Sequence, residues 1–265
     1  MINNFHTHST YCDGSESLES MVTAAIGKGL TALGFSEHCH AYYAEYNPSR
    51  EEILEYMREV LELREKYADK IEIFLGIEHE VDADWLPDGF EYIIGAAHDI
   101  KIGDEFVSVD YGAEGQRRAA EQYFGGDYYA MAEAYFETTA RIKNADIIAH
   151  FDLITKYNLN GGLFDESHPK YVAAAISAMD EILKTQNLFE VNTGAMYRVG
   201  KTEPYPSAFL LKELYNRGGE VILSSDSHDG ASLCYKFDEM KELLRHIGFR
   251  HLKTFTKNGF VNIDL

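Results

Sequence analysis

The feature that most restricts the fold of this chain is a regular alternation between short apolar segments and amphipathic helical patterns. The predicted strands are the segment that leads into His6 and residues 32–36, 71–77, 92–97, 146–149, 188–191 and 220–224. The predicted helices start near Ser17 and Ser49 and cover residues 128–143, 171–184, 207–217 and 236–245, followed by a C-terminal tail at 252–265. Strands that alternate with helices favour parallel β/α units.

Residue types that bind metal ions follow the ends of at least six of these strands. They are His6 with His8, His38, His98, His150, Glu78, and Asp226 with His228. In a β/α barrel all parallel strands end on one face, where the following loops build the active site. The sequence therefore predicts that these residues converge on a metal site.

The segment His6-Thr7-His8 has a geometric reason to belong to such a site. Side chains alternate along an extended chain, so two imidazoles about 6–7 Å apart face the same way and can bind one divalent ion. The chain has 11 histidines, so this motif alone is equally compatible with chance. The ligand-type residues at the later strand ends decide in favour of metal binding.

Residues 99–127 interrupt the alternation. Residues 100–102 and 106–109 flank the turn-forming pair Gly103-Asp104, which predicts a β-hairpin. An insertion of this length beside a site is typically a lid or specificity loop. The absence of repeats and of linker-like composition favours one domain over residues 1–265.

Composition excludes several classes of partner. The net charge of −20 argues against a nucleic-acid partner, because phosphate contacts supply most of that affinity. No 18-residue apolar run and no cationic leader occur, which argues against a membrane protein or a secreted one. Cys12, Cys39 and Cys234 lack C-x-x-C spacing, so we expect a reducing cytoplasm and no disulfide framework.

Taken together, the motifs resemble those of the polymerase and histidinol phosphatase (PHP) superfamily. They are His6-x-His8 with Asp13, Ser36-Glu37-His38, Gly76-Ile77-Glu78, His98, Ala149-His150 and Ser225-Asp226-Ser227-His228. Residues 190–194, Arg198 and Tyr205-Pro206-Ser207 are similar to those of the stand-alone histidinol-phosphate phosphatases. The resemblance implies a distorted (β/α)7 TIM-like barrel with its metal site at the C-terminal ends of the strands.

The resemblance also implies a centre of three divalent ions, with zinc, iron and manganese all compatible with its nitrogen and oxygen ligands. The implied ligands are His6, His8, Glu78 and Asp226 for the first ion, Glu78, His98 and His150 for the second, and Asp13, His38 and His228 for the third. Some family members carry histidine at the position of Asp13, where a carboxylate favours a harder ion.

The implied activity is hydrolysis of the phosphomonoester L-histidinol phosphate to L-histidinol and inorganic phosphate in histidine biosynthesis. A metal-bridging hydroxide would attack phosphorus, and one of Asp13, His38 and His228 would assist the leaving alkoxide. From position alone, Arg198 is the best candidate for a phosphate clamp. Lys156 and Arg117 are weaker candidates that could equally be surface cations.

Alternatives remain at this level. A PHP-type phosphoesterase could act on nucleotides or short oligonucleotides, and a non-catalytic metal-binding module is a third class. An amidohydrolase also begins with H-x-H, but it has eight strands and usually a bridging lysine, where this chain offers Glu78. Tyr42 and Tyr43 could wall a substrate pocket by stacking or pack at the barrel rim. The oligomeric state, a homodimer included, stays open.

Overall fold

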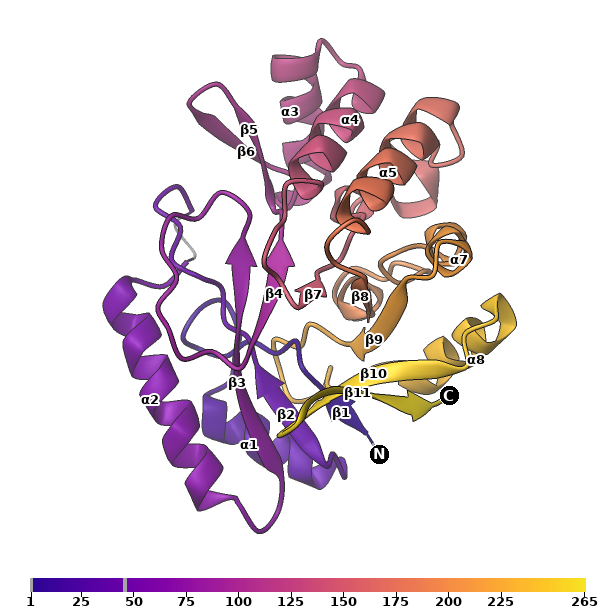
Figure 1. The fold of residues 1–265 in the computed structure, drawn as a ribbon. Helices are drawn as coiled ribbons and strands as arrows, with labels where there is room; N and C mark the ends of the chain where they lie inside the picture. The colour runs from indigo at the N-terminus through magenta and orange to yellow at the C-terminus, as the bar shows by residue number, and fades with distance from the viewer. Residues whose placement is uncertain (1, 45–46) are drawn as a thin grey trace.

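The alternating segments fold into a strongly curled sheet with helices on its outer side (Figure 1), as seen in a computed structural model that describes residues 2–44 and 47–265. In sheet order the strands are β1 (Asn3–Asn4), β2 (Ala32–Phe35), β3 (Glu72–Glu80), β4 (Tyr92–Ala96), β7 (Ile147–Ile148), β8 (Leu188–Asn192), β9 (Glu220–Ser224), β10 (His251–Thr256) and β11 (Gly259–Asp264). Within this sheet, β1, β2, β3, β4, β7, β8 and β9 pair parallel, as the alternation with helices predicted.

The first and last parallel strands of the sheet are joined by backbone hydrogen bonds at their C-terminal ends. There the backbone N–H of His8 donates to the carbonyl of Ser227 at 2.8 Å, and the N–H of Ser227 donates to the carbonyl of His6 at 3.2 Å. At the opposite end the antiparallel pair β10–β11 lies beside β9, and Asn3 Nδ2 donates to Thr254 Oγ1 at 2.7 Å. The distorted seven-stranded barrel is thus confirmed, whereas the predicted C-terminal tail is a β-hairpin.

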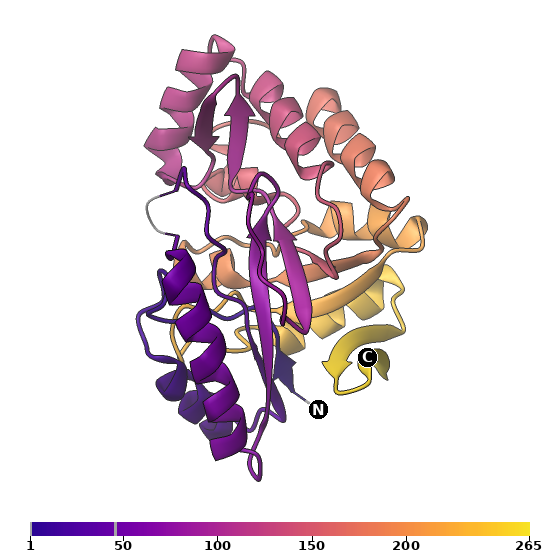
Figure 2. The same cartoon turned by 60° about the vertical axis from the view of Figure 1, so that its left-hand side comes forward.

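The helices lie outside the barrel and carry the chain from one strand to the next (Figure 2). They are α1 (Leu18–Gly27), α2 (Arg50–Lys66), α4 (Tyr128–Thr139), α5 (Pro169–Ile182), α7 (Ala208–Asn216) and α8 (Phe237–Ile247). At the start of α2 the Ser49 side chain accepts from the N–H of Glu52, and the Glu52 side chain accepts from the N–H of Ser49. This reciprocal cap fixes the helix where the sequence placed it. Among the described residues, no helix has the length and apolar character needed to cross a membrane.

Tyr92 is a large, fully buried side chain inside the barrel, where it packs with Phe5 and Phe255. Its hydroxyl donates to the carbonyls of Phe5 at 2.7 Å and Phe35 at 2.9 Å. Gly34 on β2 and Gly76 on β3 face its ring so closely that a Cβ at either position would overlap the tyrosine. These two glycines are needed because the ring occupies the space that their side chains would fill.

The segment between β4 and α4 stands apart from the barrel, at the top of Figure 1. It contains β5 (Asp99–Ile102), β6 (Glu105–Ser108) and the helix α3 (Gly112–Phe124). The two strands pair antiparallel across a turn at Gly103 and Asp104, as the sequence predicted. The helix was not predicted.

Candidate metal centre

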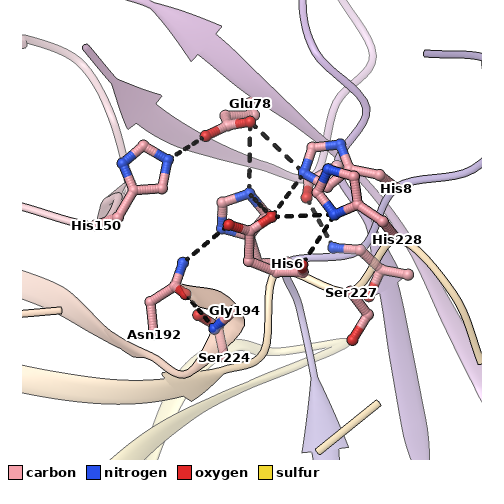
Figure 3. A network of polar contacts seen from close by, with 12 residues as sticks. His6, His8, Glu78, His150, Asn192, Gly194, Ser224, Ser227 and His228 are labelled. Atoms are coloured by element: carbon pink, nitrogen blue, oxygen red, sulfur yellow. Dashed lines mark hydrogen bonds and ion pairs between the residues drawn. The ribbon is translucent and has the colours of Figure 1, made fainter. Parts of the chain in front are cut away.

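Glu78 lies at the centre of a buried cluster of histidines at the C-terminal end of the barrel (Figure 3). Its Oε1 is 2.9 Å from Nε2 of His150, and its Oε2 is 2.8 Å from Nδ1 of His38. Its oxygens lie 3.5–3.7 Å from the Nε2 atoms of three further histidines, namely His6, His8 and His98. Burial alone would raise the pKa of Glu78, but the surrounding imidazoles hold this pKa well below its usual value. One carboxylate thus faces imidazoles from several strands.

Two of the histidines are held from behind by carboxylates. His6 Nδ1 lies 2.8 Å from Glu190 Oε2, and His98 Nδ1 pairs with Glu80 Oε1. A carboxylate on one ring nitrogen fixes the imidazole tautomer and leaves the other nitrogen to bind a metal. The Nε2 atom of His6 is buried and makes no hydrogen bond within the described residues, while it faces Glu78 at 3.5 Å. This arrangement is what metal ligation requires.

His8 and Asp226 extend the cluster on the side of β9. His8 Nε2 is also buried, makes no hydrogen bond to the part of the chain that the structure describes, and faces Asp226 Oδ1 at 3.2 Å. Burial, together with the neighbouring His228 and His38, lowers the pKa of His8 to about 3. The ring is therefore neutral, which is the form that binds metal ions.

A third group lies closer to solvent. Asp13 Oδ2 is 3.1 Å from His228 Nε2, and Asp13 Oδ1 is 3.5 Å from His38 Nε2. The Asp13 side chain is 42% exposed, whereas the other ligand candidates are largely buried. This group forms the outer edge of the cluster.

The structure brings all nine expected ligands to one end of the barrel. Four groups have ligand atoms close enough to share an ion: His8 with Cys12, Asp13 and His38; His6 with His8 and Glu78; His8 with Asp226 and His228; and His38 with Glu78 and His98. His8 and His38 recur among these groups, and His150 joins the cluster through its contact with Glu78. The donors fit divalent ions that accept imidazole and carboxylate ligands.

A cavity of about 310 Å³ opens beside the cluster. Its lining combines the outer ligands with Ser108, Asp110 and Tyr111, all from the inserted segment. Two of the three cations named from the sequence, Arg198 and Lys156, also line it.

Arg198 and Lys156 are each anchored by a carboxylate. Arg198 ends the short helix α6 (Gly194–Arg198), and its Nη2 donates to Asp226 Oδ2 at 2.8 Å. Lys156 Nζ lies 2.6 Å from Asp110 Oδ1. These pairs hold both cationic groups at the wall of the cavity.

The structure does not bring Arg117 to this cavity. It lies on the exposed side of α3, where Nη1 is 3.6 Å from Glu114 Oε2. Tyr42 and Tyr43 do not line the cavity either. Tyr43 stacks on Phe106 of β6 at 3.7 Å between ring centroids, so these tyrosines join the rim of the barrel to the inserted hairpin.

Sequence reasoning missed the carboxylates behind the ligands. Glu190 on β8 accepts from Asn192 Nδ2 at 2.7 Å and from the backbone N–H of His150 at 2.6 Å, besides contacting His6. The available signal was the spacing of two residues between Glu190 and Asn192, and between Glu78 and Glu80. Side chains two apart on a strand share a face, so an acidic residue there points into the barrel.

Comparisons with known proteins agree with a metal-binding site in this barrel. The family model described as "PHP domain" matches residues 4–194. A histidinol-phosphatase of Lactococcus lactis is 26% identical over 266 residues, covering 96% of this chain and 94% of that protein. A relative from Deinococcus radiodurans, named a probable histidinol-phosphatase, is 27% identical over 269 residues, covering 94% of this chain and 96% of that protein.

A solved structure has a similar fold over nearly the whole chain. The crystal structure of histidinol phosphate phosphatase from Lactococcus lactis, complexed with zinc, L-histidinol and phosphate, superposes with a TM-score of 0.75 at 23% identity. The alignment covers 98% of both chains. With a barrel of this form, a ligand cluster at its C-terminal end and a family model that matches most of its length, this chain belongs to the PHP domain family.

Proposed function

We propose that this chain is a metal-dependent phosphomonoesterase that hydrolyses L-histidinol phosphate to L-histidinol and inorganic phosphate, a step of histidine biosynthesis. The observation that carries the proposal is the buried pair His6 and His8, whose Nε2 atoms make no hydrogen bond among the described residues and face Glu78 and Asp226 beside a cavity with two anchored cations. Relatives that match this chain over more than nine-tenths of its length carry the same activity in their names.

The site is proposed to hold three divalent ions, with zinc, iron and manganese as candidates. His6, His8, Glu78 and Asp226 would hold one, Glu78, His98 and His150 a second, and Asp13, His38 and His228 a third. When bound, such ions lower the pKa of water and neutralise charge on a phosphoryl group. The related phosphatase from Lactococcus lactis was solved with zinc, which supports this donor set as a divalent-metal site.

Arg198 and Lys156 are proposed to bind the phosphate of the substrate. Because Asp226 holds Nη2 of Arg198, the guanidinium is oriented before a substrate enters. A planar guanidinium can donate two parallel hydrogen bonds to phosphate oxygens. The cavity volume of about 310 Å³ lies at the small end of ligand pockets, which favours a small phosphomonoester over a polymer.

Asp13, His38 and His228 border the same cavity and are proposed to supply the proton that the leaving alkoxide needs. General acids in such positions speed the departure of a poor leaving group.

Residues 1–265 are proposed to act as one phosphoesterase domain, with residues 99–127 as its lid or specificity loop. The support is that Ser108, Asp110 and Tyr111 of this segment line the cavity. Cys12, Cys39 and Cys234 are free thiols, which supports a cytoplasmic location.

The test is phosphate release from L-histidinol phosphate beside a panel of sugar phosphates, nucleotides and short oligonucleotides, with metal content measured on the same sample. We expect turnover of histidinol phosphate alone, lost on chelation and restored by added metal. Hydrolysis of nucleotides or oligonucleotides instead would overturn the substrate assignment. Metal binding without any turnover would favour a non-catalytic module.

A matched pair of variants tests the phosphate contact. Arg198→Ala should lower kcat/KM by about 10–100-fold, as expected when a charge-assisted hydrogen bond of about 1.5–3 kcal/mol is lost. Arg117→Ala removes the same side chain from an exposed site outside the cavity and should leave kcat/KM unchanged. Equal effects of the two substitutions would contradict the assignment of Arg198.

A further inference from the structure

One imidazole of the cluster is held from behind in a different way from its neighbours. His8 Nδ1 lies 3.3 Å from the sulfur of Cys12, where His6 and His98 have carboxylates. The same sulfur lies 2.7 Å from Glu37 Oε2. Cys12 therefore stands between an imidazole and a carboxylate.

Glu37 is well placed to anchor this contact. Its side chain is fully buried, and its Oε2 also accepts a hydrogen bond from the backbone N–H of Ser9 at 3.1 Å. The carboxylate is thus fixed by the backbone of the segment that carries His8. It cannot swing away from the sulfur without leaving this N–H unpaired.

The chemistry of Glu37, Cys12 and His8 determines which group donates and which accepts in each of the two hydrogen bonds. A carboxylate accepts hydrogen bonds, and a thiol has one proton to donate. Glu37 Oε2 lies 2.7 Å from the sulfur and Asp13 Oδ1 lies 3.4 Å from it, so the Cys12 S–H donates to the nearer acceptor, Glu37. The sulfur then offers only lone pairs to His8, and the ring must donate its Nδ1–H. This tautomer leaves a lone pair on Nε2, the atom that faces Glu78 and Asp226.

We propose that Cys12 is a positioning residue, which passes the hydrogen bond of Glu37 on to His8 and so holds His8 in its metal-binding tautomer. The inference rests on the metal centre of the proposed function, and it adds a residue that the expected ligand set does not include. Outer partners of metal-bound histidines raise ligand basicity and fix ring orientation. Here a thiol does for His8 what Glu190 does for His6.

The test compares three cysteine variants of the full chain, prepared without metal. Cys12→Ser keeps a hydroxyl that can donate to Glu37 and accept from His8, whereas Cys12→Ala removes both contacts. Cys234→Ser is the control, because it removes a thiol that belongs to none of the groups able to share an ion. Each protein is titrated with zinc in competition with a coloured chelator, and its histidine tautomers are read from nitrogen-15 NMR spectra of the metal-free form.

We expect Cys12→Ala to weaken zinc binding by about 10–100-fold, the usual cost of losing an outer partner of a metal-bound histidine. Its spectrum should show His8 leaving the Nδ1–H tautomer. Cys12→Ser should retain the affinity within about three-fold, because it preserves both hydrogen bonds. Cys234→Ser should match the parent protein in affinity and tautomer.

Glu37→Gln tests the same chain of contacts without touching the sulfur, and it serves if Cys12→Ala does not fold. It should weaken zinc binding in the same direction and shift the same His8 resonance. The positioning role would be overturned if Cys12→Ala left the zinc affinity and the His8 tautomer unchanged. It would also be overturned if Cys12→Ala and Cys12→Ser impaired them equally. Either result would leave the proposed function intact. A parent protein that binds no metal would instead overturn the proposed function.

Discussion

The two ends of the barrel interior differ in chemistry, although the same strands build both. On β3, Phe74 and Glu78 face the same way, whereas Ile222 lies within β9 and Asp226 follows two residues after the end of that strand. The first member of each pair packs in an apolar cluster with Phe255 of β10, and the second belongs to the metal-ligand cluster. In both cases, four positions in the sequence separate a hydrophobic core residue from a buried ionisable one.

This difference between the two ends indicates which end stabilises the fold and which end binds metal. Phe255 lies 5.2 Å from Phe74 and 5.5 Å from Tyr92 between ring centroids, so apolar burial stabilises this end of the barrel, the lower end. At the opposite end, the upper end, which holds the metal-ligand cluster, burial of carboxylates and imidazoles costs folding free energy unless they are paired or bind an ion. Changes at the lower end should therefore affect folding, and changes at the upper end should affect metal binding.

The largest effect is expected for Glu78→Gln. Five histidines face this carboxylate, so its loss should lower phosphate release by more than about 10³-fold, above the range of 10–100-fold typical of an outer partner. Metal content and initial rates measured on one preparation would check this. Full activity in the variant would break the assignment of the upper end to metal binding.

Phe255→Ala probes the lower end. Removing a buried phenylalanine should reduce the free energy of unfolding by about 3–5 kcal/mol, as is usual for phenylalanine-to-alanine changes in a core. Below the unfolding transition, the amount of metal bound per chain should stay the same. Denaturant unfolding measures the loss of stability, and metal analysis of the folded protein measures the metal bound per chain. A loss of metal from the folded variant would show that the two ends of the barrel are coupled.

Glu190→Gln should act between these extremes. It keeps the size of the side chain but removes the charge that holds His6 Nδ1 at 2.8 Å, so metal affinity should fall by about 10–100-fold. Competition with a chelator gives the affinity, and Glu213→Gln on the exposed side of α7 is a control of the same chemistry. An affinity unchanged in Glu190→Gln would refute its supporting role.

An effect confined to one range of pH is expected for Asp152, an ionisable residue at the upper end that is not a ligand candidate. Burial raises the pKa of Asp152 to about 7. Between pH 4 and pH 7 the unfolded chain therefore loses this proton while the folded chain keeps it, so stability falls as pH rises through this window, by at most about 1.4 kcal/mol per pH unit. Asp152→Asn should remove this part of the pH dependence in denaturant unfolding. A parallel pH dependence in both proteins would contradict the assignment.

Much of the architecture could be predicted because its signals are local. The capping pair Ser49 and Glu52 and the turn at Gly103 and Asp104 depend on neighbours in sequence, and both occur as predicted. The helix α3 escaped prediction because it contains Gly112 and Gly115 and buries mainly Gln116 and small alanines. None of its buried residues is a large aliphatic side chain, and its position depends on packing beside the hairpin.

Residue by residue, the sequence determined which side chains point into the barrel, since alternation along each strand is a local property. It thereby identified the ligand candidates from His6 to His228. Only the tertiary structure decided that His8 and His38 are shared among several groups, that Arg117 lies away from the cavity, and that Glu190 and Cys12 stand behind the histidines. Most of these contacts join residues that are far apart in the sequence, and the contact of Cys12 with His8 depends on the conformation of one loop. Distances of a few ångströms between such residues arise only when the barrel closes.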